Sequence, residues 1–316
     1  MELIGNQPEG KRTFFNGGPR KDDWKTEFLG LKMDKKKLKE LKLKANTLRQ
    51  DVIQMLLAAG AGHTGGPLGM ADVFTALYFH IAKHDPKDSH WDGRDRIVLS
   101  NGHICAILYA ALANCGYFPK EELATFRKID SRLQGHPARM DLPGVETSAG
   151  SLGQGIGVAV GMAMAAKLDG KEHTVFALMG DGELNEGSCW EAFLNAHKFK
   201  LDNLLVMVDR NDIQIDGYGR DVLPLEPLAD KFKAFGFDVF QADGNDMTQV
   251  VSTTEKAMKT KNQQPRVILW KTVMGKGVDF MENLPKWHGI PPNAEQAAEA
   301  MKQLQAERVR IEAEKA

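Results

Sequence analysis

Two short polar segments carry the residue types that could hold a metal ion beside a phosphate group. Gly180-Asp181-Gly182 follows an apolar run, and residues 183–210 separate it from Asn211, which follows a second apolar run. A Gly-Asp-Gly turn alone is a weak signal, so the prediction rests on its pairing with Asn211. The Asp181 carboxylate, the Asn211 amide oxygen and the Ile213 carbonyl are hard oxygen ligands suited to Mg²⁺. They would fill half an octahedron and leave room for a diphosphate, which the backbone at Gly182 could approach closely.

Four histidines stand next to glycines: His63, His103, His136 and His288. His103 follows a predicted strand and opens a predicted helix, a position where its ring could meet an anion. Imidazole suits both hydrogen bonding and proton transfer near neutral pH. Taken singly, each of these histidines fits a capping or structural role better, so the residues alone leave their function open.

The elements that must position these residues can be predicted from apolar periodicity. Helical spacing predicts helices over about 34–59 and 70–82, and we expect the glycine-rich segment 60–69 between them to be a loop. The predicted strands cover about 96–100, 174–179, 204–208, 237–241 and 266–270. The predicted helices among them cover about 104–115, 188–198, 227–235 and 247–261, and an amphipathic helix candidate spans 294–316.

Continuous apolar strands that alternate with helices predict an α/β fold, a parallel sheet flanked by helices on both faces. Ligands bind at the carboxyl ends of the strands in such sheets. Polar motifs follow residues 100, 179 and 208, so we expect them to converge there. We expect an extension of unassigned role over 1–32, a ligand-binding domain over 33–292, and a tail helix over 293–316.

The overall composition disfavours several classes of function. The chain has 316 residues, of which 42% are hydrophobic and 26% charged, as in ordinary globular proteins. A formal net charge of -1 gives no whole-chain argument for binding nucleic acid or an acidic membrane. Three scattered cysteines argue against a disulfide framework or a zinc site, and favour a reduced, cytoplasmic setting. No apolar run approaches the roughly 18 residues of a membrane span.

A dinucleotide-binding loop is also disfavoured. The segment 147–157 is rich in glycine, but it lacks the required third glycine: the sixth residue counted from Gly153 is Val158. No strand is predicted immediately before this segment. An NAD-dependent dehydrogenase is therefore set aside.

The two polar segments, extended in both directions, resemble the cofactor motif of the transketolase family. They read Gly180-Asp-Gly-Glu-Leu-Asn-Glu-Gly187 and Asp209-Arg-Asn-Asp-Ile-Gln-Ile-Asp-Gly217. The resemblance covers about residues 40–292, with several independent segments in the family order. It implies a thiamine-diphosphate-binding fold with Mg²⁺, for which Ca²⁺ or Mn²⁺ can substitute. It also implies transfer of a two-carbon ketol unit from a ketose phosphate to an aldose phosphate.

The same resemblance implies roles for the four histidines, all of which match family positions. His63, His103 and His288 would contact the diphosphate and substrate hydroxyls. His136 would contact the donor sugar hydroxyl near its carbonyl. The implied catalytic set is His63, His136 and His288.

Further roles follow for the glycine-rich segment and for the end of the metal loop. Gly150 and Leu152 match positions that support the thiazolium and aminopyrimidine rings, although Ser151 departs from the proline often found there. Glu186 matches a glutamate that meets the subunit interface and couples two active sites. The implied cofactor-binding set is His103, Gly150, Leu152, Gly182, Glu186, Asn211 and His288, and the implied metal set is Asp181, Asn211 and Ile213.

The resemblance also implies that essential parts of the site are absent from this chain. In transketolases the glutamate that contacts the aminopyrimidine, and most groups that bind the sugar phosphate, lie in the domain that follows. Met1 and the tail helix favour a natural subunit over a truncated fragment. We therefore expect a partner chain that carries the pyrimidine-binding and C-terminal domains, in an α2β2 assembly with shared sites.

Two other interpretations remain open. One keeps the cofactor but changes the ketose donor, as in a deoxyxylulose-phosphate synthase or a specialised transketolase. His136 followed by Leu142-Pro-Gly-Val-Glu favours the transketolase pattern over the synthase. The other is a non-catalytic cofactor-binding protein, which the presence of every metal and substrate residue disfavours. The exact sugars are not determined by these residues.

Overall fold

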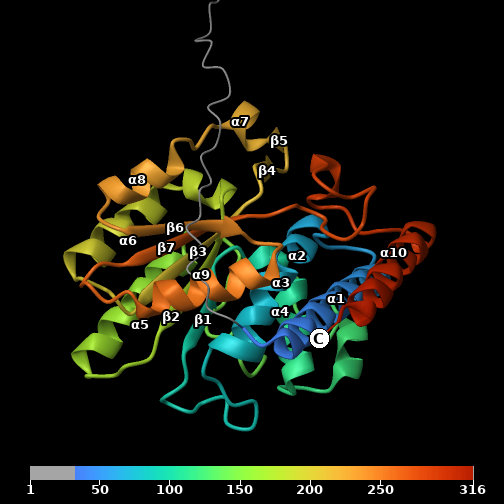
Figure 1. Cartoon of the computed structure of the whole chain (residues 1–316), viewed down its shortest axis with the longest axis horizontal. Coiled ribbons are helices and arrows are strands. Elements are labelled where there is room, and N and C mark those ends of the chain that lie inside the picture. Colours follow the sequence, from blue (N-terminus) through green and yellow to red (C-terminus); the bar gives the residue numbers. More distant parts are fainter. Residues whose placement is uncertain (1–32, 316) are drawn as a thin grey trace, which may run out of the picture.

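The computed structural model describes residues 33–315, so the predicted extension 1–32 lies outside the described residues. A five-stranded sheet forms its centre, in the order β1-β2-β3-β7-β6, and all of its neighbouring strands run parallel (Figure 1). Its strands are β1 (Arg96–Leu99), β2 (Val175–Gly180), β3 (Leu204–Arg210), β6 (Asp238–Asp243) and β7 (Arg266–Lys271). All five strands were predicted, each to within a few residues.

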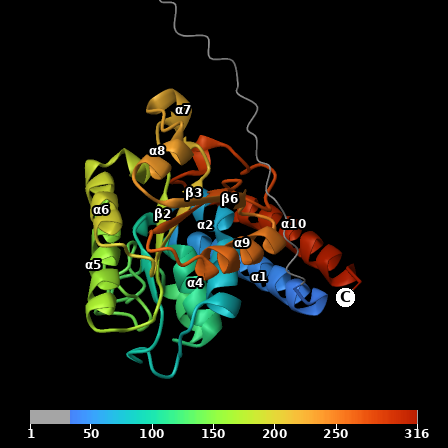
Figure 2. The same ribbon diagram turned by 60° about the vertical axis from the view of Figure 1, so that its left-hand side comes forward.

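Helices cover both faces of this sheet (Figures 1 and 2). One face packs against α1 (Lys35–Ala59), α3 (Ala71–Ala76), α4 (Cys105–Cys115) and α9 (Met247–Lys259). The other face packs against α5 (Gly155–Leu168), α6 (Gly187–Lys198) and α8 (Leu228–Ala234). This arrangement confirms the predicted fold class, a parallel sheet flanked by helices.

Alternation along each strand divides the core into two layers. In β3, Leu205 and Met207 join the cluster under α1, α3 and α4, whereas Val206 and Val208 join the cluster under α5, α6 and α8. Successive side chains of a strand point to opposite faces, so a continuous apolar run serves both layers. The carboxyl ends of the strands are therefore held from both sides.

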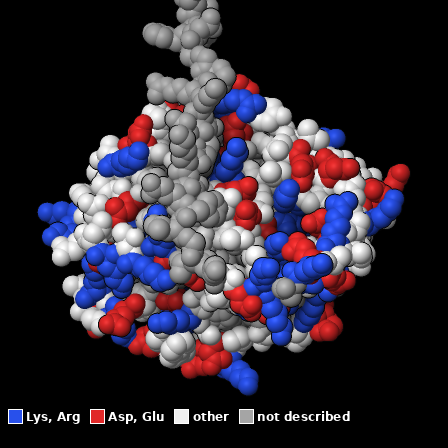
Figure 3. Space-filling model, in the orientation of Figure 1, with Lys and Arg blue, Asp and Glu red and all other residues white. Residues whose placement is uncertain are grey.

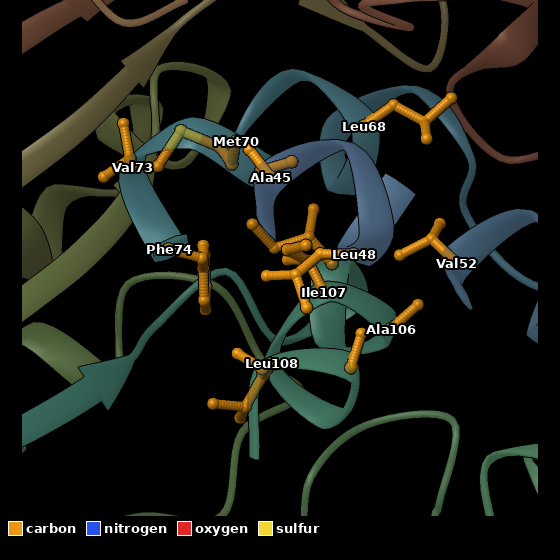
Figure 4. Packing of buried hydrophobic residues seen from close by; sticks show 14 of the residues in the cluster. Ala45, Leu48, Val52, Leu68, Met70, Val73, Phe74, Ala106, Ile107 and Leu108 are labelled. Atoms are coloured by element: carbon orange, nitrogen blue, oxygen red, sulfur yellow. The ribbon is translucent and has the colours of Figure 1, made fainter. Parts of the chain in front are cut away.

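The packing on the α1 face shows how the apolar helical positions are used. Leu48 and Val52 of α1, Phe74 of α3 and Ile107 of α4 converge and are fully buried (Figure 4). Fully burying each such side chain contributes about 1.5–3 kcal/mol. The long helix α1 thereby becomes the platform for the loops that follow it.

The expectation of a loop throughout 60–69 was wrong, because Gly65–Gly69 forms the short helix α2. Glycine has a poor intrinsic helix propensity, but close packing favours it here. A Cβ at Gly66 would lie 2.7 Å from Ile104, and one at Gly69 would lie 3.0 Å from the Val273 carbonyl oxygen. The helix therefore forms where only glycine allows neighbouring segments to approach.

Two further helices complete the comparison with the prediction. Helix α5 was not predicted, since its glycines interrupt the apolar period. Helix α10 (Ala294–Ala313) confirms the amphipathic candidate and begins with a capping box between Asn293 and Gln296. It packs along α1, where the Asn46 amide donates to the Leu304 carbonyl at 2.9 Å. The boundary proposed at 292/293 stays a prediction.

The remaining elements are short. They are a π-helical turn (Leu77–Ile81), the antiparallel pair β4 (Ile213–Gln214) and β5 (Gly217–Tyr218), α7 (Gly219–Val222), and 3-10 turns at Gly102–Ile104, Lys120–Thr125, Gly182–Asn185 and Pro285–Trp287. Acidic and basic side chains are interspersed over the face seen in Figure 3. No helix within residues 33–315 is long and apolar enough to cross a membrane.

Candidate functional site

A pocket of about 370 Å³ lies at the carboxyl edge of the sheet, where β1, β2 and β3 end. It is lined by His63, Gly66, Asn101, His103, His136, Gly150, Leu152, Gly180, Asp181, Gly182, Glu183, Asp209, Asn211, Ile213, Gln214, Ile215, Asp216, Met274 and His288. A larger groove of about 920 Å³ between α1 and α10 shares none of these residues. The site pocket collects all three of the polar motifs that were expected to converge.

One side of the pocket is carboxylate-rich and is built from two neighbouring strand ends. Gly180 of β2 pairs with Asp209 of β3, which places Asp181 beside that strand. The two oxygens of Asp181 accept hydrogen bonds from the backbone N–H groups of Gly182 and Asp212, each at 2.7 Å. Asp212 has a φ of 58°, a left-handed conformation that aspartate tolerates better than most residues. This turn brings the loop after β3 back onto Asp181.

Asp209 orients the predicted amide ligand. Its carboxylate accepts from the Asn211 Nδ2 group at 2.9 Å and also from the Thr272 hydroxyl. The Asn211 Oδ1 atom is thereby directed the other way and accepts from the Ile213 N–H at 2.9 Å. Each carboxylate or amide oxygen has a second lone pair, so Asp181 and Asn211 keep capacity to bind a cation.

Burial makes the ionised form of the carboxylates on this side unfavourable. Burial and the neighbouring Asp209 raise the pKa of Asp181 to about 7, and burial raises the pKa of Asp209 to about 6. A cation bound between these groups would remove the penalty and keep both ionised.

A cluster of imidazoles forms the second side of the pocket. His63 follows α1, His103 lies in the 3-10 turn after β1, and His288 follows the 3-10 turn Pro285–Trp287. Their ring centroids are 4.9 Å apart for His63 and His103, 5.5 Å for His63 and His288, and 5.4 Å for His103 and His288. His136 lines the same pocket. Segments far apart in the sequence are thus brought together here.

The imidazoles are held in their neutral form. Burial lowers the pKa of His63 to about 4 and that of His103 to about 3. Repulsion from the neighbouring histidines adds to both shifts, and Arg127 adds to that of His63. Burial also lowers the pKa of His136 and His288. Near neutral pH these rings can therefore both donate and accept hydrogen bonds, and an anion placed among them would favour their protonation.

A buried glutamate, which was not predicted, fixes the glycine-rich segment that contains Gly150 and Leu152. The Glu183 carboxylate accepts from the Gly153 N–H at 2.8 Å and from the Ser100 hydroxyl. A Cβ at Gly153, whose φ is 78°, would lie 2.5 Å from the Ser188 hydroxyl oxygen. Glu183 thus ties the segment to the ends of both β1 and β2.

The structure brings together every predicted site residue except Glu186. Glu186 is exposed at the N-terminus of α6 and does not line the pocket. The assigned role of each residue stays a prediction. The lining residues that were missed include Asn101, Glu183, Asp209 and Gln214. Each lies within a few residues of a predicted one, so the polar character of the strand ends was the available signal.

Three residues that line this pocket each carry a buried polar atom without a hydrogen-bond partner among residues 33–315: His63 Nδ1, Asn101 Oδ1 and Gln214 Nε2. Unpaired buried polar groups are costly and mark places where a ligand completes the bonding. No cluster of three or more His, Cys, Asp or Glu suited to a metal occurs among residues 33–315. A cation here would need oxygens from the chain together with oxygens from a ligand. The residues present therefore fit Mg²⁺ and a diphosphate bound together.

Comparison with known proteins agrees with this site. Residues 41–313 match the family described as "Transketolase, thiamine diphosphate binding domain". A protein of Actinobacillus succinogenes, named as one subunit of an apulose-4-phosphate transketolase, is 40% identical over 269 residues, which cover 85% of this chain and 97% of that protein. The 6-deoxy-6-sulfo-D-fructose transketolase subunit of a Clostridium species is 40% identical over 268 residues, with the same two coverages.

A solved structure gives the same result and adds a difference in length. The crystal structure of transketolase from Campylobacter jejuni superposes with a TM-score of 0.80 at 37% identity. The match covers 88% of this chain but only 46% of that one, so this chain spans less than half of a full-length transketolase. The predictions of fold and family are both confirmed, and the chain belongs to the transketolase family as a counterpart of its thiamine diphosphate binding domain.

Proposed function

We propose that this chain is the cofactor-binding subunit of a split transketolase. Together with a partner chain it transfers a two-carbon ketol unit from a ketose phosphate to an aldose phosphate, with thiamine diphosphate and Mg²⁺. One observation carries the proposal: buried carboxylates and partly exposed imidazoles line a single pocket. A metal–diphosphate group has a cation for the first side and an anion for the second.

Different residues of this chain bind the metal and the cofactor. Asp181, Asn211 and the Ile213 carbonyl hold Mg²⁺, with Ca²⁺ or Mn²⁺ as substitutes, and Gly182 allows the diphosphate to approach the backbone. His103 and His288 donate hydrogen bonds to the cofactor. The bound cofactor supplies a nucleophilic carbon and an electron sink.

Two histidines are placed to handle the protons of the donor sugar. His63 and His136 line the pocket, and their lowered pKa leaves them neutral near pH 7. A neutral imidazole can accept a hydroxyl proton, and the resulting cation can return it. His136 would bind the hydroxyl nearest the donor carbonyl.

The partner chain supplies what this chain lacks. The pyrimidine-binding glutamate and the sugar-phosphate groups would come from it, in an α2β2 assembly. Two relatives of similar length are themselves named as single subunits of a transketolase. Helices α5 and α6 lie together on the outer surface (Figure 2) and expose Val158, Leu168 and Leu194. Exposed Glu186 opens α6, so we place the partner on this face.

The partner face can be tested separately from activity. Leu194, 59% exposed on α6, is replaced by aspartate, and partner binding is measured by analytical ultracentrifugation. Burying a leucine contributes about 1.5–3 kcal/mol, so the dissociation constant should rise at least about tenfold. Leu57→Asp on α1, where Leu57 is 41% exposed, is the matched control. Equal effects of the two substitutions would place the partner elsewhere.

A second candidate changes only the ketose donor. Two of the relatives are named for apulose 4-phosphate and 6-deoxy-6-sulfo-D-fructose, so donors differ among proteins about 40% identical to this chain. A pentose phosphate donor is the first choice because a solved transketolase from Pichia stipitis is described in complex with xylulose 5-phosphate. We place the enzyme in the cytoplasm, which three free cysteines support.

The proposed reaction is tested by ketol transfer from xylulose 5-phosphate to ribose 5-phosphate, with thiamine diphosphate and Mg²⁺. The assay is run on the chain alone and on the chain co-purified with the product of the neighbouring gene. We expect activity only in the pair. Activity of the chain alone would contradict the shared site. If the pair binds the cofactor but is inactive with these sugars, the two other donors are tried, and inactivity with all of them would favour a non-catalytic protein.

A further inference from the structure

The histidine side of the pocket is supported by an arginine that does not itself line the pocket. Arg127 follows the 3-10 turn Lys120–Thr125, and its guanidinium carbon lies 5.4 Å from the centre of the Phe126 ring. Phe126 is fully buried. The arginine side chain is therefore anchored against the core.

The guanidinium occupies the space between two glycines, and each of these glycines precedes a histidine of the site. A Cβ at Gly135 would lie 2.8 Å from Arg127 Cζ and 3.0 Å from both Nη atoms. A Cβ at Gly62 would lie 3.5 Å from Arg127 Nε. The next residues along the chain are His136 and His63. One planar group thus separates the two segments that carry these histidines.

The segment before His136 is also held by hydrogen bonds from three side chains. Arg127 Nη2 donates to the Gly135 carbonyl at 3.1 Å, and the Cys105 thiol donates to the same oxygen at 3.2 Å. The Tyr109 hydroxyl donates to the Gln134 carbonyl at 2.8 Å. Two successive peptide groups are therefore fixed immediately before His136.

Arg127 is held in this place against local preferences. Its φ of 59° lies in the left-handed region, which is uncommon for arginine, and its buried Nε–H has no hydrogen-bond partner in the described part of the chain. Such strained and unsatisfied residues persist where the surroundings impose them, and they cluster at functional sites.

We propose that Arg127 is a positioning residue that sets the separation of His63 and His136, and with it the fit of the donor sugar. This inference rests on the proposed function, because the donor is what the two histidines would bind. Arg127 acts through the Gly62 and Gly135 backbones and does not touch the substrate.

The pKa values of the histidines can be measured independently of catalysis. The pKa of His63 is lowered by burial first, then by His288, Arg127 and His136. The pKa of His136 is lowered by burial and then by Arg127. The pKa of His288 is lowered by burial alone. Removing the charge of Arg127 should therefore raise the first two values and leave the third unchanged.

The kinetic test compares Arg127→Met with Arg132→Met in the complex with the partner chain. Arg132 is a matched control: its guanidinium carbon lies 5.6 Å from the Phe118 ring and it bonds to Glu122, but it touches neither histidine segment. We expect Arg127→Met to lower kcat/KM for the ketose donor at least about tenfold while the Kd for thiamine diphosphate changes little. Arg132→Met should leave both values near wild type.

Histidine NMR on the full chain provides the second test, with signals assigned through His63→Gln, His136→Gln and His288→Gln. In Arg127→Met the pKa values of His63 and His136 should rise, and that of His288 should stay constant. Arg127→Lys should restore these pKa values without restoring kcat/KM, since lysine keeps the charge but lacks the planar spacer. Equal behaviour of Arg127→Met and Arg132→Met in both tests would overturn the proposal.

Two further outcomes have a defined meaning. If Arg127→Met fails to fold, Arg127→Lys and Tyr109→Phe replace it, because each removes only part of the support. A loss of donor kcat/KM in both then supports the proposal, and wild-type kinetics in both overturns it. If the wild-type complex transfers no ketol group, the proposed reaction has failed, while the NMR result still decides whether Arg127 governs His63 and His136.

Discussion

Burial shifts the pKa values on the carboxylate side and on the histidine side of the pocket in opposite directions, each towards the uncharged form. Burial raises the pKa of Asp181 to about 7, whereas burial lowers the pKa of His63 to about 4. Without a ligand, each side favours its uncharged form. A metal–diphosphate group supplies a positive charge to the first side and a negative charge to the second. The contrast supports the proposal of a metal–diphosphate group, which carries both charges, as the ligand.

The two sides also differ in how the chain assembles them. Asp181 and Asn211 follow neighbouring strands, β2 and β3, so the sheet places them together directly. His63, His136 and His288 come from separate loops, and Arg127 packs between the segments that carry His63 and His136. We therefore expect substitutions on the carboxylate side to act on metal and cofactor binding, and substitutions of His63 and His136 to act on the donor sugar.

The largest effect is expected for Asp181→Ala, which removes the charged ligand proposed for the metal. Cofactor binding should lose its Mg²⁺ dependence, so that affinity in Mg²⁺ falls to the level measured in EDTA. Isothermal titration calorimetry of the complex with its partner measures this. Asp230→Ala on α8, where the aspartate pairs only with Lys233 at the surface, is the control. An unchanged, Mg²⁺-dependent affinity for thiamine diphosphate would remove Asp181 from the metal site.

Asp209→Asn should have the next largest effect, because Asp209 orients the amide of Asn211. Loss of such a supporting group typically weakens metal affinity about 10–100-fold. Titration of Mg²⁺ at saturating thiamine diphosphate measures the change. Wild-type affinity for Mg²⁺ in this variant would show that Asn211 needs no such support, or is not a ligand.

His136→Ala tests the other side of the comparison. A lost hydrogen bond to a substrate hydroxyl costs about 1–2 kcal/mol, so kcat/KM for the ketose donor should fall roughly tenfold. The Kd for thiamine diphosphate should stay close to wild type. His80→Ala, at an exposed contact with Glu255, controls for loss of a histidine elsewhere. Equal losses in donor use and cofactor affinity would move His136 into the cofactor contacts.

The smallest effect is expected when pH is varied, which should change the Kd for Mg²⁺-dependent binding of thiamine diphosphate. Below about pH 7 the metal-free folded chain holds a proton on Asp181, and Mg²⁺ must displace it. The Kd should therefore weaken by at most about tenfold for each pH unit below 7, and level off above it. The pKa values of His63 and His103, about 4 and about 3, lie well below this window.

Asp209→Asn provides the control for this pH dependence, because burial and then the Asp209 carboxylate raise the pKa of Asp181, and this variant removes the second cause. The bend in the plot of Kd against pH should move to lower pH in this variant. Any proton that the cofactor itself takes up is common to both proteins and cancels. A bend at the same pH in both would assign it to another group.

The sequence predicted the sheet and the carboxylate side well, because both follow from local patterns. Apolar runs mark buried strands, and polar residues directly after two of them mark a site. The histidine side was identified by resemblance, since nothing local to His63 or His288 indicates that their rings lie 5.5 Å apart. The roles of Glu183 and Arg127 depend on contacts between segments distant in sequence. Helix α2 was missed because tertiary packing overrides the low helix propensity of glycine.

A crystal structure of the chain with its partner, thiamine diphosphate and Mg²⁺ would test the central claim most directly. We expect Mg²⁺ about 2.1 Å from oxygens of Asp181 and Asn211 and from the Ile213 carbonyl. The diphosphate should lie between this ion and the imidazoles of His103 and His288. A metal bound away from Asp181, or a diphosphate that contacts none of the histidines, would contradict the account.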